Sequence, residues 1–189
     1  MNTASNTGVT ELAAGRFVSL KVISWTDAHG VARKWESAER VNNSGAVLII
    51  PLLEPSGRIA LIRQFRPPAG RAVIEFPAGL VDAGEDPETA ARRELREETG
   101  YIASRMEIHP PAYTTPGLSN ESVYMAKAFI DEETPDNRNP RTDFDSSEMI
   151  DTILLPHNEL LRFYREETAK GVAFDAKLAA YILGLPTPA

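Results

Sequence analysis

The chain has 189 residues, 42% hydrophobic and 25% charged, which suits one domain with a buried core, either alone or with a small appendage. It contains no cysteine, and this excludes disulfides, thiolate metal sites and cysteine nucleophiles. A formal net charge of −7, without a basic run longer than two residues, argues against a nucleic-acid partner.

The N-terminal part predicts a tail followed by strands. Residues 1–15 have neither a basic start nor an apolar block, so we expect a flexible tail and not a secretory signal. Strand-like composition over residues 17–25 and 31–41, with the turn sequence TDAHG between them, predicts a hairpin. The longest apolar run, residues 46–53, predicts a buried strand. It is far too short to cross a bilayer, so no membrane partner is expected. The absence of cysteine is compatible with a reducing cytoplasm, which is the expected location.

A central helix and further strands are expected in the remaining chain. Asp86 suits the N-cap of that helix, Pro87 its first turn and Gly100 its C-terminal cap. The polar, turn-rich segment 131–148 is expected to be a long surface loop of the kind that often carries function. Strands are expected at residues 46–53, 59–65, 106–113, 122–130 and 149–155, and helices near residues 157–169 and 175–183. Residues 72–76 form a short apolar segment, and PAGLVDAGED (77–86) is expected to be a loop. This order predicts a mixed α/β or α+β domain.

The sequence RRELREETG, residues 92–100, places three glutamates on one side of the expected helix. Glu94, Glu97 and Glu98 fall within an arc about 100° wide that borders the apolar stripe. A solvated face with an Arg93–Glu97 ion pair is one interpretation. However, Glu94 and Glu98 repel each other at i,i+4, and the helix dipole disfavours anions in the last turn. A bound Mg²⁺ or Mn²⁺ would remove both penalties, and such ions commonly join protein carboxylates to substrate phosphates.

The glutamates belong to a longer pattern with fixed spacing. It reads G-x5-E-x7-R-E-L-x-E-E-x-G-Y and is carried by Gly79, Glu85, Arg93, Glu94, Leu95, Glu97, Glu98, Gly100 and Tyr101. This pattern resembles the Nudix box, the signature of hydrolases that cleave nucleoside diphosphates linked to another moiety. Its last position is usually aliphatic, and Tyr101 is expected to pack there and not to react. A ligand-binding regulatory module on a Nudix-like fold would be expected to lose box glutamates, whereas all are present here.

Sequence blocks outside the box look like the ADP-ribose pyrophosphatase branch of this family. They are RQFRPPAGRAVIEFPAGLVD (63–82), TTPGLSNE (114–121) and WESAERV (35–41). The resemblance implies a Nudix α/β/α sandwich over residues 44–189, extended by an N-terminal hairpin over residues 16–43. It also implies Mg²⁺-dependent cleavage of ADP-ribose to AMP and ribose 5-phosphate, with Mn²⁺ as a substitute. Another ADP-sugar, a GDP- or UDP-sugar or an oxidised nucleotide stays open as the substrate, because the box handles the diphosphate and not the base.

The resemblance further implies a set of metal ligands. Glu94 and Glu98 would be the principal ligands, and Glu97 would be a third carboxylate, assigned to both metal binding and catalysis. Ala78 would offer its backbone carbonyl to a metal, although its side chain is equally typical of a small loop residue.

Catalytic roles follow from the same resemblance. Arg93 would orient a catalytic glutamate and Glu85 would support the box, with a surface ion pair as the competing interpretation of Arg93. In this branch the general base often lies outside the box, before a late strand. Glu148 aligns with that base, Glu121 is a weaker rival, and Asp145 stays open.

Substrate contacts are implied on both sides of the box. Arg66 looks like the arginine that contacts the diphosphate, and Arg40 is a second candidate; a solvated arginine is the alternative for each. Glu36 is the candidate acceptor for the adenine amino group. In this branch the N-terminal hairpin builds a homodimer in which two aromatic rings from different subunits sandwich the adenine, and Trp35 and Phe17 fall at those positions. The alternative is that the hairpin, marginally stable alone, covers the core of its own chain.

Overall fold

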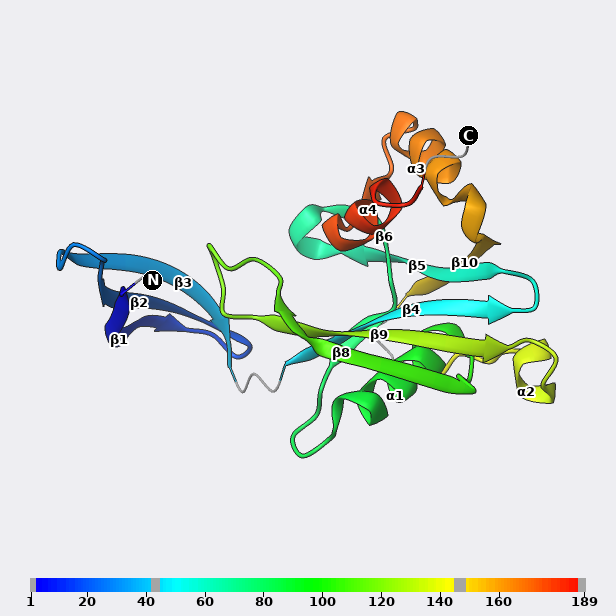
Figure 1. Ribbon diagram of the computed structural model, residues 1–189, viewed down its shortest axis with the longest axis horizontal. Helices are drawn as coiled ribbons and strands as arrows, with labels where there is room; N and C mark the ends of the chain where they lie inside the picture. Colours follow the sequence, from blue (N-terminus) through cyan, green and yellow to red (C-terminus); the bar gives the residue numbers. More distant parts are fainter. Residues whose placement is uncertain (1–2, 42–44, 145–148, 187–189) are drawn as a thin grey trace. The chain divides into compact units, whose positions relative to one another are not determined.

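The computed structural model describes residues 3–41, 45–144 and 149–186. The chain divides into two compact units, one made of Met1–Ala46 and Pro111–Val123 and the other of Val47–Pro110 and Tyr124–Ala189 (Figure 1). Within the described ranges, no helix is both long and apolar enough to cross a membrane.

The first unit is built on a three-stranded antiparallel sheet. β1 (Ser5–Ala14) pairs with β2 (Val18–Thr26), and β2 pairs with β3 (Ala32–Arg40). The predicted hairpin over residues 17–25 and 31–41 is confirmed as β2 and β3. Its short connection and alternating, β-branched residues favour this pairing.

The presence of β1 contradicts the expectation of a flexible N-terminal tail. The prediction of a flexible tail over residues 1–15 is wrong for residues 5–14, because their backbone pairs with β2 along almost the whole strand. All ten residues of β1 are exposed, so no alternation of apolar and polar side chains reveals the strand in the sequence. Backbone hydrogen bonding to its neighbour, and not side-chain burial, holds this strand.

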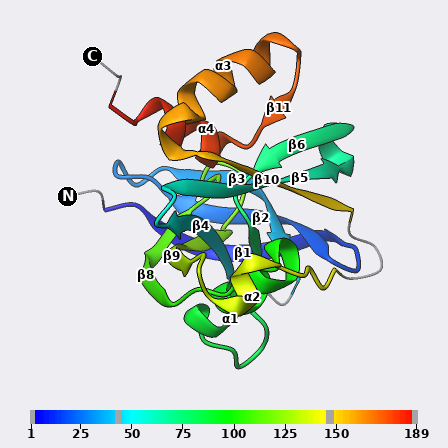
Figure 2. The same cartoon turned by 90° about the vertical axis from the view of Figure 1, so that its right-hand side faces the viewer.

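The second unit contains a mixed sheet between helices. The elements are β4 (Ala46–Glu54), β5 (Arg58–Arg66), β6 (Arg71–Glu75), β7 (Ala78–Leu80), α1 (Pro87–Thr99), β8 (Arg105–Tyr113), β9 (Ser122–Asp131), α2 (Pro135–Arg138), β10 (Ile150–Pro156), α3 (Leu160–Ala169), β11 (Ala173–Phe174) and α4 (Ala176–Leu183). One end of each of β4, β8 and β9 belongs to the first unit. The strand order is β11-β6-β5-β4-β9-β8, with β10 paired to β5 and β7 paired to β4. Helix α1 lies on one side of these strands, and α3 and α4 lie on the other (Figures 1 and 2). The predicted α/β/α sandwich is thereby confirmed.

Helix α1 begins and ends where the sequence predicts. The Asp86 carboxylate accepts hydrogen bonds from the backbone N–H groups of Glu88 at 3.0 Å and Thr89 at 3.1 Å, which closes the first turn. At the other end Gly100 has a φ of +75°, and its N–H donates to the Arg96 carbonyl at 2.8 Å. The caps therefore fix the helical register that places the glutamates.

The core of the second unit forms around α1. It comprises Val47, Ile49, Leu53, Ala60, Val81, Ala90, Ala91, Leu95, Tyr101, Ala103, Ala126, Ala128 and Ile130. Tyr101 is only 4% exposed, and burial raises the pKa of its phenol. The expectation that Tyr101 packs is therefore confirmed.

The polar segment 131–148 departs from the expected surface loop, because it contains α2 and a buried asparagine. The Asn137 side chain accepts a hydrogen bond from the Ile102 N–H at 2.8 Å. It also donates to the carbonyls of Ile102 at 3.0 Å and Asp131 at 2.8 Å. One amide side chain thus replaces backbone pairing between two segments, which composition does not reveal. β7 likewise forms within residues expected to be loop.

Gly100 makes a testable contribution to stability. A Cβ at this position would lie 2.5 Å from the backbone nitrogen of Arg141, and its φ of +75° disfavours side chains. We expect Gly100→Ala to reduce the free energy of unfolding by about 2–4 kcal/mol in urea titrations. The matched control is Gly57→Ala, where φ is +66° but nothing lies within 4 Å of the added atom. It should cost about 1 kcal/mol, and equal losses would show that the contact with Arg141 does not matter.

Candidate functional site

Glu98 is a buried carboxylate held against a strand. It lies on the inward side of α1 and is 3% exposed. Its Oε2 accepts a hydrogen bond from the backbone N–H of Ala78 in β7 at 2.9 Å. Because a buried ionised carboxylate needs compensating donors or cations, this position favours a charged partner.

Glu94 lies against the neighbouring residue of the same strand. A Cβ at Gly79 would lie 2.0 Å from both Cδ and Oε1 of Glu94, so only glycine leaves room for this carboxylate. Glu94 and Glu98 are one helical turn apart, and they meet β7 at adjacent residues. The arc predicted from the sequence therefore becomes two carboxylates facing one short stretch of backbone.

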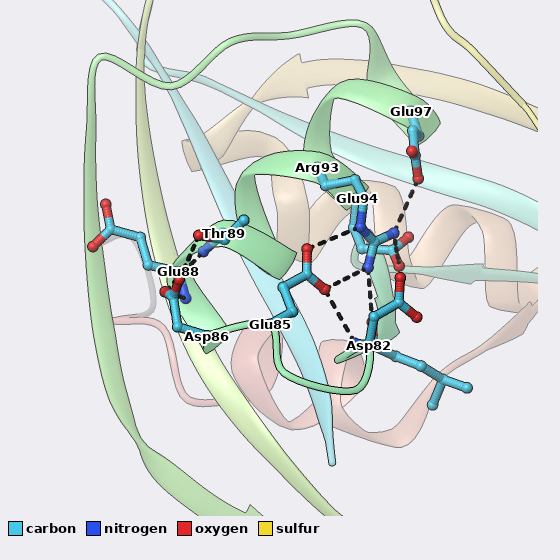
Figure 3. A network of polar contacts seen from close by, with 9 residues as sticks. Asp82, Glu85, Asp86, Glu88, Thr89, Arg93, Glu94 and Glu97 are labelled. Atoms are coloured by element: carbon cyan, nitrogen blue, oxygen red, sulfur yellow. Dashed lines mark hydrogen bonds and ion pairs between the residues drawn. The ribbon is translucent and has the colours of Figure 1, made fainter. Parts of the chain in front are cut away.

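Arg93 joins several groups of the box (Figure 3). Its Nη1 donates to Glu94 at 2.7 Å and to Glu97 at 3.1 Å. Its Nε and Nη2 donate to the two carboxylate oxygens of Glu85 at 3.1 and 3.0 Å. Nη2 also donates to the carbonyl of Leu80 at 2.9 Å, so the guanidinium ties α1 to the end of β7. The structure thus shows the surface pair with Glu97 and, in addition, contacts that position the other carboxylates.

The electrostatics of this network follow from its geometry. The hydrogen bonds to Glu85 raise the pKa of Arg93 further above its usual value. The same hydrogen bonds lower the pKa of the Glu85 carboxyl below its usual value. Both groups are therefore charged at neutral pH. The bidentate arrangement, which only a planar guanidinium makes, fixes the side-chain orientation of Arg93.

Arg66 is the second cation near the buried carboxylates. Its Nε donates to Glu75 at 2.7 Å, and Glu75 is itself buried. Burial would lower the pKa of Arg66, but the hydrogen bond to Glu75 and the nearby charges of Glu98 and Asp175 raise it. The sequence singled out Arg66 without indicating Glu75, the residue that holds it.

Trp35 and Phe17 are both exposed aromatic residues of the first unit. Trp35 is 51% exposed, and its indole N–H donates to the Gly117 carbonyl at 2.9 Å. Its ring borders a hollow of about 210 Å³ that Tyr113 and Leu118 also line. Phe17 is 65% exposed, and the Arg16 guanidinium lies 5.0 Å from the centre of its ring.

Arg40 and Glu121 contact each other in the first unit. Arg40 Nε donates to Glu121 Oε1 at 2.5 Å, and the Thr114 hydroxyl donates to Glu121 Oε2 at 3.2 Å. Glu36 lies exposed on β3. The roles expected of Arg40 and Glu36 stay predictions. The two other candidates for the general base, Glu148 and Asp145, lie outside the described residues.

The carboxylates fit a hard divalent cation that shares its coordination with a substrate. Within residues 3–41, 45–144 and 149–186, no three acidic or imidazole side chains gather closely enough to hold a metal unaided. Mg²⁺ usually keeps several waters and takes one or two carboxylates together with substrate phosphates. Glu94 and Glu98 supply two such carboxylates, and both lie against the backbone of β7. Neither sulfur nor imidazole is offered, and this favours Mg²⁺ or Mn²⁺ over softer metals.

Comparison with known proteins agrees with this geometry. The NUDIX domain family model matches residues 43–178. The chain belongs to the NUDIX domain family. An ADP-ribose pyrophosphatase from Saccharomyces cerevisiae is 36% identical and covers 94% of this chain and 80% of its own. An ADP-sugar pyrophosphatase from Mus musculus is 35% identical, covering 92% of this chain and 84% of its own.

A solved structure supports the Nudix fold independently. The crystal structure of an ADP compounds hydrolase superposes with a TM-score of 0.72 over 95% of this chain and 90% of that chain, at 18% sequence identity. At that identity the likeness concerns the fold alone.

Gly79 offers a test of how the Nudix box places Glu94. In Gly79→Ala the added methyl group must displace the Glu94 carboxylate, a flexible group that can move without disturbing the core. We therefore expect the melting temperature to change by no more than about 2–4 °C, which corresponds to roughly 1 kcal/mol in a chain of this length. The Mg²⁺ concentration for half-maximal activity should rise about tenfold, as expected for loss of one well-placed charged contact. The control is Gly8→Ala, where nothing lies within 4 Å. An unchanged Mg²⁺ requirement in Gly79→Ala would contradict this placement of Glu94.

Proposed function

We propose that this Nudix protein hydrolyses the diphosphate of ADP-ribose to AMP and ribose 5-phosphate in a Mg²⁺-dependent reaction. The main observation behind this proposal is that Glu94 and Glu98 lie against adjacent residues of β7. The Arg66 cation is close enough to interact electrostatically with Glu98. Relatives named ADP-ribose pyrophosphatase and ADP-sugar pyrophosphatase, each matching more than nine-tenths of the chain, support the substrate.

The metal would be held by Glu94, Glu98 and the Ala78 carbonyl, with Glu97 as a further carboxylate. A bound divalent ion lowers the pKa of coordinated water and neutralises phosphoryl oxygens. Arg93 acts as a positioning residue in this proposal, because its guanidinium bonds both Glu94 and Glu97. Mn²⁺ is expected to substitute for Mg²⁺, since both take oxygen ligands.

Arg66 and Glu148 complete the proposed chemistry. Arg66 contacts the diphosphate, where a fixed positive charge stabilises the charge that develops during phosphoryl transfer. Its bond to the buried Glu75 holds the guanidinium before substrate arrives, which reduces the cost of ordering it. Glu148 takes the proton of the attacking water, as the match to the family's late loop suggests.

Adenine recognition is proposed to use Trp35 and Phe17 in a homodimer. Trp35 pairs with Ile23 on β2, whereas the Phe17 carbonyl accepts from the Val41 N–H at 3.0 Å. Six residue positions separate 35 from 41 along the chain, which is about 20 Å in an extended strand. Two rings so far apart on one sheet do not sandwich one base, so a clamp made of both requires two copies of the chain. Glu36, beside Trp35, is the proposed acceptor for the adenine amino group.

A broader preference for ADP-sugars is the second candidate function. The mouse relative is named an ADP-sugar pyrophosphatase, and the box contacts only the part of the substrate that all nucleoside diphosphate sugars share. We place the reaction in the cytoplasm as part of the proposal.

A panel of nucleotide sugars tests the reaction directly. With Mg²⁺, we expect ADP-ribose to be hydrolysed faster than GDP- and UDP-sugars, with AMP released, because the adenine clamp and the diphosphate site act on one substrate. Chromatography of the products measures this, with an EDTA-treated sample as the control. Activity that survives EDTA would reject the metal mechanism, and a preference for GDP- or UDP-sugars would reject the substrate.

Trp35 tests the adenine clamp separately from the chemistry. Base–aromatic stacking contributes about 1–3 kcal/mol, so Trp35→Ala should raise KM for ADP-ribose about 5- to 150-fold while kcat changes much less. Trp35→Phe keeps an aromatic face and should recover most of the loss. An unchanged KM in Trp35→Ala, or a monomer in sedimentation at micromolar concentration, would remove the dimeric clamp.

A further inference from the structure

A second hollow lies in the Nudix unit, at the carboxyl end of α1. Its volume is about 400 Å³, within the range of small-molecule sites. Arg96 and Gly100 line it from the helix end, Ile102 from the segment after the helix, and Asp136 and Arg141 from the chain around and after α2. Glu94, Glu98 and Arg66 are not among its lining residues, so the proposed reaction does not use it.

The walls of this hollow are fixed by contacts in the second unit. The buried Asn137 side chain bonds both the N–H and the carbonyl of Ile102, which holds α2 against the residues after the helix. The backbone of Arg141 packs so closely on Gly100 that a Cβ there would lie 2.5 Å from the Arg141 nitrogen. Beyond it, the Asp143 N–H donates to the carbonyl of Glu97 in α1 at 3.0 Å. The hollow is therefore preformed and does not depend on a mobile wall.

The charges in the hollow favour an anion. Within the described part of the chain, no carboxylate pairs with Arg96 or Arg141, whereas Arg92 and Arg93 on the same helix both make ion pairs. Asp136 contributes one negative charge, so the two guanidiniums leave the hollow with an excess of one positive charge. The carboxyl end of a helix repels anions, and the attraction must therefore come from the two arginines. Guanidinium groups match the oxygen geometry of phosphate and hold it through paired hydrogen bonds.

We propose that this hollow is an anion site, distinct from the diphosphate site, that binds a phosphate group through Arg96 and Arg141. The group is either free phosphate or the phosphomonoester of a small molecule, the class to which both products of the proposed reaction belong. Arg96 also lines an adjoining hollow of about 480 Å³ that Arg93 and Glu97 border. A phosphate held by Arg96 therefore lies beside the Nudix box and outside the set of metal ligands.

Binding of inorganic phosphate to the metal-free protein tests this site without using activity. The full-length protein in EDTA is titrated with phosphate at constant ionic strength, and binding is followed by calorimetry. We expect saturable binding, and we expect Arg96→Gln and Arg141→Gln each to weaken it about 5- to 20-fold, as loss of a charge-assisted contact does. Both side chains are exposed, so melting temperatures without phosphate should match the wild type.

Two control variants separate this site from other cations. Arg165 is exposed on α3, and no ion pair engages it within the described residues, so Arg165→Gln should bind phosphate as the wild type does. Arg66→Gln should also bind normally, because Arg66 belongs to the proposed diphosphate site. Absence of saturable binding, unchanged affinity in both Arg96→Gln and Arg141→Gln, or loss of binding in Arg66→Gln would each overturn the proposal while leaving the proposed hydrolase function untouched.

Titrations with different ligands distinguish free phosphate from a phosphomonoester as the source of the bound phosphate group. Ribose 5-phosphate and AMP are titrated in the same way. If either compound binds more tightly than inorganic phosphate, and if this binding depends on Arg141, the ligand is the phosphomonoester of a small molecule. Equal or weaker binding of both compounds identifies free phosphate as the ligand, and both results support the site.

Discussion

The close approach of α1 to β7 is the constraint on which the rest of the site depends. The helix buries Ala90, Ala91 and Leu95 against the sheet, and the same packing brings its glutamates onto the strand. Small residues at the strand make this possible, since any side chain at Gly79 would occupy the space of the Glu94 carboxylate. Hydrophobic burial of one stripe of the helix thus supplies the force that presents the neighbouring carboxylates to one stretch of backbone.

Arg93 reduces the electrostatic repulsion between these carboxylates. Carboxylates crowded on one side of a helix repel each other, and the guanidinium offsets part of this by bonding Glu85, Glu94 and Glu97 at once. The lowered pKa of Glu85 means that its stabilising contribution is present at neutral pH and is lost as pH falls through that lowered value. One arginine does not neutralise the whole cluster, and the remaining negative charge is what a divalent cation would balance. The charges that hold the box together are therefore the same ones that favour a divalent cation.

The sequence predicted what periodicity and spacing determine. The bounds of α1, its two caps and the arc of glutamates follow from local preferences, and the structure confirms them at Asp86 and Gly100. Most strands were predicted because their side chains are apolar on at least one face. β1 was not predicted because every residue in it is exposed, and α2 was not predicted because a single buried amide side chain holds it in place. Such features depend on pairings between distant segments that no local pattern encodes.

For the site, the spacing of the box indicated which residues gather but not what holds them. Glu75 supports Arg66 and Gly79 accommodates Glu94, and both facts depend on how β6 and β7 are placed beside other elements. The proposed metal site requires that Glu94 and Glu98 together hold a divalent ion, and Mn²⁺ titration followed by electron paramagnetic resonance measures that binding. We expect Glu98→Gln to weaken Mn²⁺ binding about tenfold or more. Glu88→Gln, which changes an exposed glutamate of the same helix paired with Arg92, should leave the binding unchanged. Equal Mn²⁺ affinity in the wild type and Glu98→Gln would show that Glu98 is not a metal ligand.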